Sequence, residues 1–324
     1  MKKSLFIMVC VLLAVNSCEK DESAYNDPIE AGKWTLLNST NGFKGSQVLN
    51  IKSDSRSDLW FAVDGYGAAR FSGNTWSYFN TSNSAILSNN ITCIEEASDG
   101  TLFFGTANGF SMLSSGKDWS SYRYPGVIMD ITVIKSMKDK TIWIGTKSTG
   151  LFIIEGNTIT QIDLSLMGWI NDLEEDNKGN IWIATDSGLI KFDGNTISVL
   201  TTADGLPDDI VTSLHFDSKE RLWIGTYFGK TASWMQGRTI MQLSLQNGNS
   251  VSEINDIFED RAGNVWFATW GSGLLRYDGV ITQAFKKYNG FPEDDVLSIG
   301  EDNSGHLWFG LYSKGLVRYT LPLD

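Results

Sequence analysis

The hydrophobic pattern of this chain repeats seven times. In each repeat a bulky apolar anchor is followed by a second bulky apolar residue and then by Gly or Ala, and an aliphatic residue stands nine positions before the anchor. The anchors are Trp60, Phe103, Trp143, Trp182, Trp223, Trp266 and Trp308. A period of about forty residues with this pattern is typical of a β-propeller, in which each repeat forms one four-stranded blade.

The fourth repeat shows how the pattern divides into strands. We expect strands at 170–174, 181–185, 189–192 and 196–200, with turns at 176–179 and 193–195. Ile181, Trp182 and Ile183 are consecutive apolar residues, which indicates a strand buried on both faces. The small residue two positions after each anchor, Ala184 in this repeat, would leave room for a side chain of the adjacent blade.

The two ends of the repeat array predict how the ring closes. The last repeat has a third strand at 315–319 but no outer strand after it, and residues 32–37 match the outer-strand pattern of other repeats. We therefore predict an all-β, seven-bladed propeller of antiparallel blades over residues 33–321, in which the N-terminal strand completes the C-terminal blade. A closed ring has no open edge to cover, so we expect a monomer.

The first residues have the pattern of a secretory leader. Lys2 and Lys3 precede an apolar stretch at 5–15, and the segment ends in Val15-Asn16-Ser17-Cys18, which resembles a bacterial lipobox. We interpret 1–17 as a lipoprotein signal peptide, Cys18 as the lipidated residue, and 18–32 as a flexible tether. An ordinary secretory leader is the alternative. The acidic run at 19–22 favours the cell-surface side of an outer membrane over the periplasmic side.

Charge and cysteine content narrow the functional classes. The formal net charge is −12, and no basic patch is present, so the sequence argues against nucleic-acid binding. Besides Cys10 and Cys18, the chain has one cysteine, Cys93, which lies in an apolar strand and is expected to be a buried small residue. We predict no disulfide in the mature chain and no cofactor.

An aspartate stands six residues before the anchor in five repeats. These residues are Asp54, Asp176, Asp217, Asp260 and Asp302. A calcium loop would need further ligands at fixed positions, which these segments lack. The pattern therefore favours hairpin turns, in which the Asp side chain accepts bonds from backbone amides, and we expect no metal.

Three segments carry a family resemblance. Residues 255–279 and the related loops at 204–209 and 289–295 resemble the two-component regulator propeller repeat, and the resemblance extends over about 33–320. In that family the propellers form periplasmic sensors of hybrid histidine kinases, often for oligosaccharides. Those sensors usually carry two propellers, whereas these repeats account for one. The resemblance therefore implies that this chain binds a ligand or a partner. It does not imply that the chain signals across a membrane by itself.

Propeller sites usually lie where the loops after the second strands and the loops between blades surround the channel mouth. Five aromatic residues fall in those loops: Tyr66, Trp169, Tyr227, Trp270 and Tyr312. Such rings suit a sugar or a peptide, but each could equally cover its own blade. Four polar residues of the inner strands lie next to them: Asn171, Asp172, Asn255 and Asp256. These could bind ligand hydroxyls or hold channel water.

The histidine content bears on whether the chain is an enzyme. The repeats are also distantly similar to seven-bladed streptogramin lyases, whose chemistry requires a histidine base and a Mg²⁺ site. The chain has two histidines, His215 on an inner strand and His306 in a turn on the opposite face, and no His–Glu pair converges. We predict a non-enzymatic, lipid-anchored module for a glycan or glycan-derived ligand. The alternatives are a protein-interaction scaffold of a surface uptake complex and a lyase.

Overall fold

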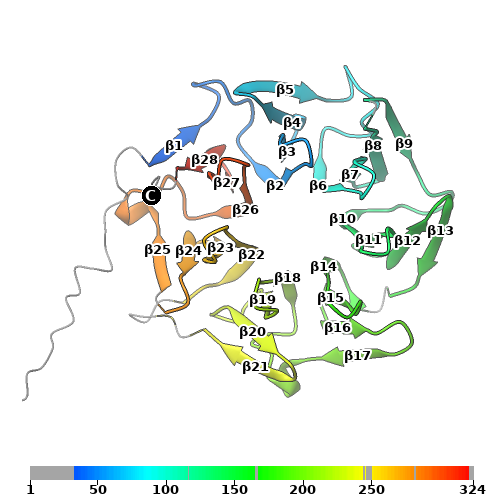
Figure 1. Ribbon diagram of the computed structural model, residues 1–324, viewed down its shortest axis with the longest axis vertical. Helices are drawn as coiled ribbons and strands as arrows, with labels where there is room; N and C mark the ends of the chain where they lie inside the picture. Colours follow the sequence, from blue (N-terminus) through cyan, green and yellow to red (C-terminus); the bar gives the residue numbers. More distant parts are fainter. Residues whose placement is uncertain are drawn as a thin grey trace, which may run out of the picture.

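The computed structural model describes residues 33–115, 117–164, 167–243, 245, 250–280 and 282–320. They form seven four-stranded antiparallel sheets arranged as blades around a central channel (Figure 1). The seven-bladed, all-β prediction is confirmed. The leader, the tether and Cys18 lie outside the described residues. Among the residues described, no helix is long and apolar enough to cross a membrane.

The strands follow the repeats in order. Blade 1 contains β2 (Val48–Ser53), β3 (Leu59–Val63), β4 (Gly67–Ser72) and β5 (Thr75–Phe79). Blade 2 contains β6 (Ile91–Glu96), β7 (Leu102–Thr106), β8 (Gly109–Leu113) and β9 (Trp119–Tyr122). Blade 3 contains β10 (Ile131–Ser136), β11 (Ile142–Thr146), β12 (Leu151–Glu155) and β13 (Thr158–Ile162).

Blade 4 contains β14 (Ile170–Glu175), β15 (Ile181–Thr185), β16 (Gly188–Phe192) and β17 (Ile197–Leu200). Blade 5 contains β18 (Val211–Phe216), β19 (Leu222–Thr226), β20 (Ser233–Gln236) and β21 (Thr239–Gln242). Blade 6 contains β22 (Glu253–Glu259), β23 (Val265–Trp270), β24 (Leu274–Tyr277) and β25 (Thr282–Phe285). Blade 7 contains β26 (Val296–Glu301), β27 (Leu307–Leu311), β28 (Leu316–Tyr319) and β1 (Trp34–Leu37).

Blade 7 closes the ring as the sequence predicts. Strand β1 pairs antiparallel with β28, from Trp34 opposite Tyr319 to Leu37 opposite Leu316, so the two ends of the array lie side by side (Figure 1). The Trp34 ring lies 4.3 Å from the Tyr319 ring and also contacts aromatic rings of blades 6 and 7. The closing strand is thus held by side-chain packing as well as by backbone hydrogen bonds.

The inner strands form the channel and interlock from blade to blade. The pairing of every inner strand with the second strand shifts register once, and in five blades the extra residue is Thr or Asn: Thr92, Thr132, Asn171, Thr212 and Asn255. Each of these side chains donates to a backbone carbonyl at the start of the next inner strand, as Thr92 does to Ile131 at 2.8 Å. A β-bulge redirects the side chain of its extra residue. Here the redirected Thr or Asn side chain forms a hydrogen bond to the neighbouring blade.

The small residues after the anchors are needed for close packing between blades. A Cβ added to Gly145 would lie 2.5 Å from Ile170 of the next blade, and one added to Gly225 would lie 2.9 Å from Ile254. Real side chains do not approach so closely, so a larger residue would overpack the joint. The prediction that an adjacent blade fills this space is confirmed.

Cys93 lies inside this packing. It is buried on β6 against the second-strand position of Gly105, and it forms no disulfide. Burial raises the pKa of its thiol to about 12, so the thiol stays protonated at neutral pH. Cys93 is therefore a structural residue, as expected.

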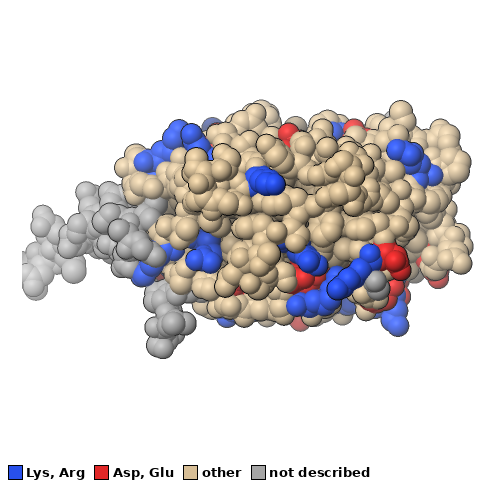
Figure 2. All heavy atoms as spheres, turned by 90° about the horizontal axis from the view of Figure 1, so that it is seen from above, with Lys and Arg blue, Asp and Glu red and all other residues tan. Residues whose placement is uncertain are grey.

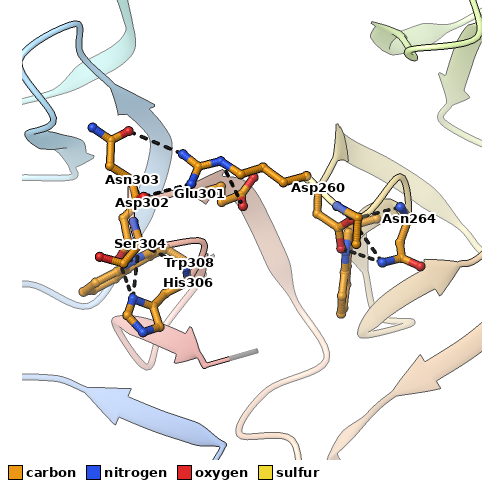
Figure 3. Close-up of polar contacts among 11 residues, drawn as sticks. Asp260, Asn264, Glu301, Asp302, Asn303, Ser304, His306 and Trp308 are labelled. Atoms are coloured by element: carbon orange, nitrogen blue, oxygen red, sulfur yellow. Dashed lines mark hydrogen bonds and ion pairs between the residues drawn. The ribbon is translucent and has the colours of Figure 1, made fainter. Parts of the chain in front are cut away.

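The five aspartates form a clasp at the turn between the first and second strands. In blade 6, one oxygen of Asp260 accepts from the backbone amides of Ala262 and Asn264, and the other accepts from the indole Nε1–H of Trp266 at 2.7 Å. The clasp of blade 7 repeats this geometry with Asp302 and Trp308, and His306 adds its ring (Figure 3). The prediction of hairpin turns is confirmed. The clasp also includes the anchor tryptophan, which the sequence did not indicate.

Candidate functional site

The disc has two faces. The top face is made of the loops after the second strands and the loops between blades, and the bottom face of the turns within each blade. Figure 2 shows the disc edge-on, with basic side chains scattered over this side among mostly uncharged residues. Two regions contain the residues predicted from the sequence: the aromatic residues of the top face and the channel.

The predicted aromatic residues all reach the surface of the top face. Their exposed fractions are 49% for Tyr66, 48% for Trp169, 36% for Tyr227, 39% for Trp270 and 43% for Tyr312. They belong to the loops of consecutive blades, from the entry of blade 4 through blades 5, 6 and 7 to blade 1. We call this set the aromatic arc. Blades 2 and 3 place Ala107 and Lys147 at the equivalent positions of their loops.

Three members of the arc occupy the same position in three successive blades. Tyr227 and Tyr312 follow directly after the buried last residue of the second strand, Thr226 or Leu311, and Trp270 is the last residue of β23, directly after the buried Thr269. The backbone amides of Tyr227 and Tyr312 donate to carbonyls of the preceding interblade loop at 3.0 and 3.1 Å. The backbone is thus anchored at these positions, while the rings are turned toward solvent.

One ring pair forms within the arc, and a second joins the arc to a neighbouring ring. Trp270 and Tyr312 meet edge to face with their centroids 4.9 Å apart, across the joint between blades 6 and 7. Tyr227 contacts its neighbour Phe228 at 4.3 Å, and Phe228 is 63% exposed. Phe228 was not among the residues predicted from the sequence, although its place directly after Tyr227 in the same loop indicates it.

Trp169 is held in a different way. Its backbone amide donates to Asp186 Oδ2 at 3.3 Å, and the Lys147 ammonium lies 4.9 Å from the centre of its ring. The loop that carries Lys147 continues into a shallow depression of about 710 Å³, lined by Ile128, Thr149 and Gln161 among others. The top face is therefore hollowed next to one end of the arc.

Acidic residues of the loop before blade 7 accept hydrogen bonds from the loops that carry two residues of the arc. Glu293 is buried and accepts from the amides of Ser313 and Lys314, in the loop that follows Tyr312. Asp295 accepts from the Gly271 amide at 2.7 Å, directly after Trp270. Carboxylates that accept backbone N–H groups fix the loop geometry, so these side chains position the two aromatic residues.

The inner-strand candidates have two separate roles. Asn171 and Asn255 are the bulge residues whose amides bond to Val211 and Val296 of the next blade, at 2.8 and 2.7 Å. The Asn171 amide also donates to Asp186 at 3.0 Å. These two side chains are therefore occupied by contacts that join the blades.

Asp172 and Asp256 instead line the channel cavity, next to those bulges. Each carboxylate accepts one amide of its own strand and one of the next blade, from Leu214 at 2.7 Å and from Ile299 at 2.8 Å. Burial raises the pKa of both groups to about 7, and the negative charge of Asp172 adds to the effect on Asp256.

The channel contains a ring of side chains that sequence reasoning missed. In each inner strand, the residue directly after the aliphatic that stands nine positions before the anchor lines the cavity: Lys52, Glu95, Lys135, Glu174, His215, Phe258 and Gly300. Lys52 pairs with Glu95 at 2.6 Å and Lys135 with Glu174 at 2.7 Å, each across a blade joint. Charged residues at one position of four successive repeats could have indicated this ring.

The histidines have structural partners. The Nε2 of His215 accepts from the Glu259 amide at 3.2 Å, and burial lowers its pKa, so its ring is neutral at pH 7. His306 Nδ1 lies 3.0 Å from Asp302 in the bottom-face turn. Among the residues that the structure describes, no three or more His, Cys, Asp or Glu side chains are placed to hold a metal ion.

The comparisons with known proteins agree with this architecture. The family model described as "Two component regulator propeller" matches residues 85–108, 164–187, 205–228 and 247–271. Each match begins before an inner strand and ends just past the second strand. A histidine kinase P4 from Formosa agariphila is 28% identical over 232 residues, which are 64% of this chain and 16% of that protein. The chain thus corresponds to about a sixth of that relative's length.

Solved structures show the same fold. The extracellular domain of a hybrid two-component system from B. thetaiotaomicron matches with a TM-score of 0.74 and 18% identity, over 89% of this chain and 41% of that one. A virginiamycin B lyase from Staphylococcus aureus matches with a TM-score of 0.73 and 15% identity, over 90% and 99% of the two chains. The protein is therefore a seven-bladed β-propeller, and four of its segments match the two-component regulator propeller repeat.

Proposed function

We propose that this protein is an extracytoplasmic binding module, tethered by lipid on Cys18 at the outer membrane, that takes a glycan or glycan-derived ligand on its top face. The observation that carries the proposal is the exposed aromatic residue at one position of three successive blades, Tyr227, Trp270 and Tyr312. Isolated exposed rings are common, whereas adjoining rings on one face are typical of a binding surface.

The chemistry of the arc suits a sugar. Each ring offers a flat apolar face to the C–H groups of a pyranose, and the tyrosine hydroxyls can bond to its hydroxyl groups. The loops are already fixed by Glu293 and Asp295, so little ordering would accompany binding. The depression beside Trp169 offers space for a further sugar unit.

A protein partner is the second candidate, and Phe228 favours it. Its ring has no polar tip and is more exposed than any member of the arc, which suits an apolar side chain of a peptide better than a sugar hydroxyl. A scaffold role in a surface uptake complex would use the same face. We propose no catalytic role, since His215 and His306 are both engaged in structural contacts.

A glycan array of the purified protein tests the first candidate, with hits quantified by calorimetry. Trp270→Ala should weaken the best hit by about tenfold or more, because a ring at the centre of a binding surface contributes over 1 kcal/mol. Ile197→Ala is the control, since Ile197 is an exposed apolar residue of the outer strand β17. Loss of peptide binding on Phe228→Ala, without any glycan hit, would favour the scaffold.

A further inference from the structure

The bottom face has a pocket at the joint between blade 4 and blade 5. It has a volume of about 400 Å³ and lies between the turns at 176–180 and 217–220, which connect the first and second strands of these two blades. None of its lining residues belongs to a top-face loop. We call it the joint pocket, and it is separate from both the aromatic arc and the channel cavity.

The joint pocket lies where blade 5 lacks an aromatic ring that other blades have. In blades 1, 4, 6 and 7, the third-strand residue opposite the start of the second strand is aromatic, and its ring contacts the anchor tryptophan of the preceding blade: Phe71, Phe192, Tyr277 and Tyr319. Blade 5 has Met235 at this position, opposite Leu222. The apolar wall of the pocket is therefore formed by Met235, Leu222 and Trp182, the anchor of blade 4.

Four carboxylates line the joint pocket, and each of them already accepts hydrogen bonds. Asp176 and Asp217 belong to the clasps of blades 4 and 5. Burial raises the pKa of each, but the hydrogen bonds from the turn and the indole outweigh burial, so both pKa values are lowered. Glu175 accepts a backbone amide of blade 3 at 2.7 Å, and Glu220 accepts from the Asn177 amide at 2.6 Å. The acidic groups of the pocket are thus occupied.

Four lysines line the same pocket, and three of them lack an acceptor. Lys138 donates to the Asp176 carbonyl at 2.7 Å. Within the described part of the chain, the ammonium groups of Lys178, Lys191 and Lys219 form no ion pair and no hydrogen bond, although Lys191 lies 5.3 Å from the centre of the Trp182 ring. Lys178 and Lys219 each stand two residues after a clasp aspartate, one in each turn. A ligand therefore meets free ammonium groups and occupied carboxylates, which favours an anion.

Amide and indole groups complete the wall of the joint pocket. The side chains of Asn177, Asn180 and Gln236 line it. The Trp182 Nε1 lies 3.4 Å from Asp176 Oδ2, whereas the equivalent distances in the other four clasps are 2.7–2.9 Å, so this N–H is the least engaged of the five. A pyranose has an apolar C–H face and hydroxyl groups around its edge. A wall of mixed apolar and amide groups suits such a ring.

We propose that the joint pocket binds a pyranose that carries a negatively charged substituent, a carboxylate or a sulfate. The apolar face of the sugar would lie against Trp182 and Met235, and its charged group between Lys178 and Lys219. Methionine adapts its shape to a ligand better than the aromatic rings that stand at this position in other blades. The inference is independent of the proposed function, because it uses none of the residues of the aromatic arc.

Calorimetry of the purified protein with three sets of sugars tests the proposal. Glucuronate and galacturonate carry a carboxylate, the 6-sulfates of glucose and galactose carry a sulfate, and glucose and galactose are the neutral controls. At least one charged set should bind about tenfold more tightly than the neutral set, as expected for hydrogen bonds to a charged group, and that set identifies the substituent. Equal affinity of charged and neutral sugars would overturn the proposal. So would equal binding of acetate, which has the charge but no ring.

Variants locate the bound sugar. Lys178→Gln and Lys219→Gln should each weaken binding by about threefold, since each removes one exposed ion pair. Lys287→Gln, on an exposed lysine of a top-face loop, is the matched control. Met235→Phe should abolish binding without lowering the melting temperature, because blades 1 and 4 have phenylalanine at this position. Binding that survives all three pocket substitutions would refute the site. Trp270→Ala should leave it unchanged, and loss of binding in that variant would place the sugar on the arc instead.

Discussion

The carboxylate of Asp260 accepts a hydrogen bond from the indole N–H of Trp266, six residues later, at 2.7 Å. The same bond recurs between Asp54 and Trp60 at 2.9 Å and between Asp217 and Trp223 at 2.8 Å. Blade 2 has Ala97 at the Asp position and Phe103 as its anchor, which has no N–H to satisfy. Blade 3 has Met137 at the Asp position, and its Trp143 N–H donates to Thr141 at 3.0 Å instead. In the five blades that have it, the aspartate satisfies the N–H of the anchor indole.

Removing this acceptor should be costly. Asp260→Ala leaves the buried Trp266 N–H and two turn amides without a partner, so we expect a loss of about 3 kcal/mol in the free energy of unfolding. Urea unfolding measures it. Asp99→Ala in the turn of blade 2 is the control, because exposed Asp99 accepts only from Thr101, and it should cost less than about 0.5 kcal/mol. Equal losses would show that the indole bond is unimportant.

Two tryptophans of strand β23 should differ in how much each contributes to the free energy of unfolding. Trp266 is 1% exposed in the core, and Trp270, four residues later, is 39% exposed in the arc. Trp266→Ala should lower the free energy of unfolding by about 3–5 kcal/mol, and Trp270→Ala by less than about 1 kcal/mol. Thermal and urea unfolding of both variants check this. If Trp270→Ala destabilises the fold as much as Trp266→Ala, its ring belongs to the core.

Deleting residues 33–38 should open the ring. The deletion removes β1 and its Trp34 ring from blade 7, so the edge of β28 is exposed together with Tyr319 and Phe285. An unpaired edge beside exposed aromatic rings promotes association between chains. We expect a lower melting temperature and concentration-dependent aggregation by light scattering. A deletion variant that stays monomeric and melts like the parent would contradict the closure by β1.

The channel aspartates should make the protein more stable at mildly acidic than at neutral pH. Their pKa is raised from 3.8 to about 7, so between these values the folded state binds protons that the unfolded state lacks. Stability therefore falls as the pH rises from about 4 to about 7. The lowered pKa of His215 acts in the opposite direction. Asp172→Asn/Asp256→Asn should flatten the fall in urea midpoint relative to the parent; an unchanged slope would refute this.

Membrane attachment should depend on Cys18. Because Cys18 follows a leader that resembles a lipobox, Cys18→Ala should move the protein from the membrane fraction to the soluble fraction. Cell fractionation with immunoblotting measures the shift, and Cys93→Ala is the control, since Cys93 is buried in the propeller. A Cys18→Ala protein that stays with the membrane would disprove lipid anchoring at this residue.

The sequence by itself determined the fold. The anchors, the turn residues and the small residue after each anchor are local patterns, and local patterns set strand positions, burial on both faces and the number of blades. The outer-strand pattern before β2 also predicted the closing pair of β1 and β28, because a strand without a partner can be matched to a blade that lacks one. The exposed positions of Tyr227, Trp270 and Tyr312 followed from their place at or just past the end of the second strand.

Only the tertiary structure decided what the inner-strand polar residues do. Asn171 and Asp172 are neighbours in sequence, yet one bonds across the blade joint and the other faces the channel, because a β-bulge turns the first side chain aside. The pairings of Lys135 with Glu174 and of Arg261 with Glu301 depend on which blades stand next to one another around the axis. Contacts between residues about forty positions apart arise from closure of the ring, and no local pattern encodes which of their atoms meet.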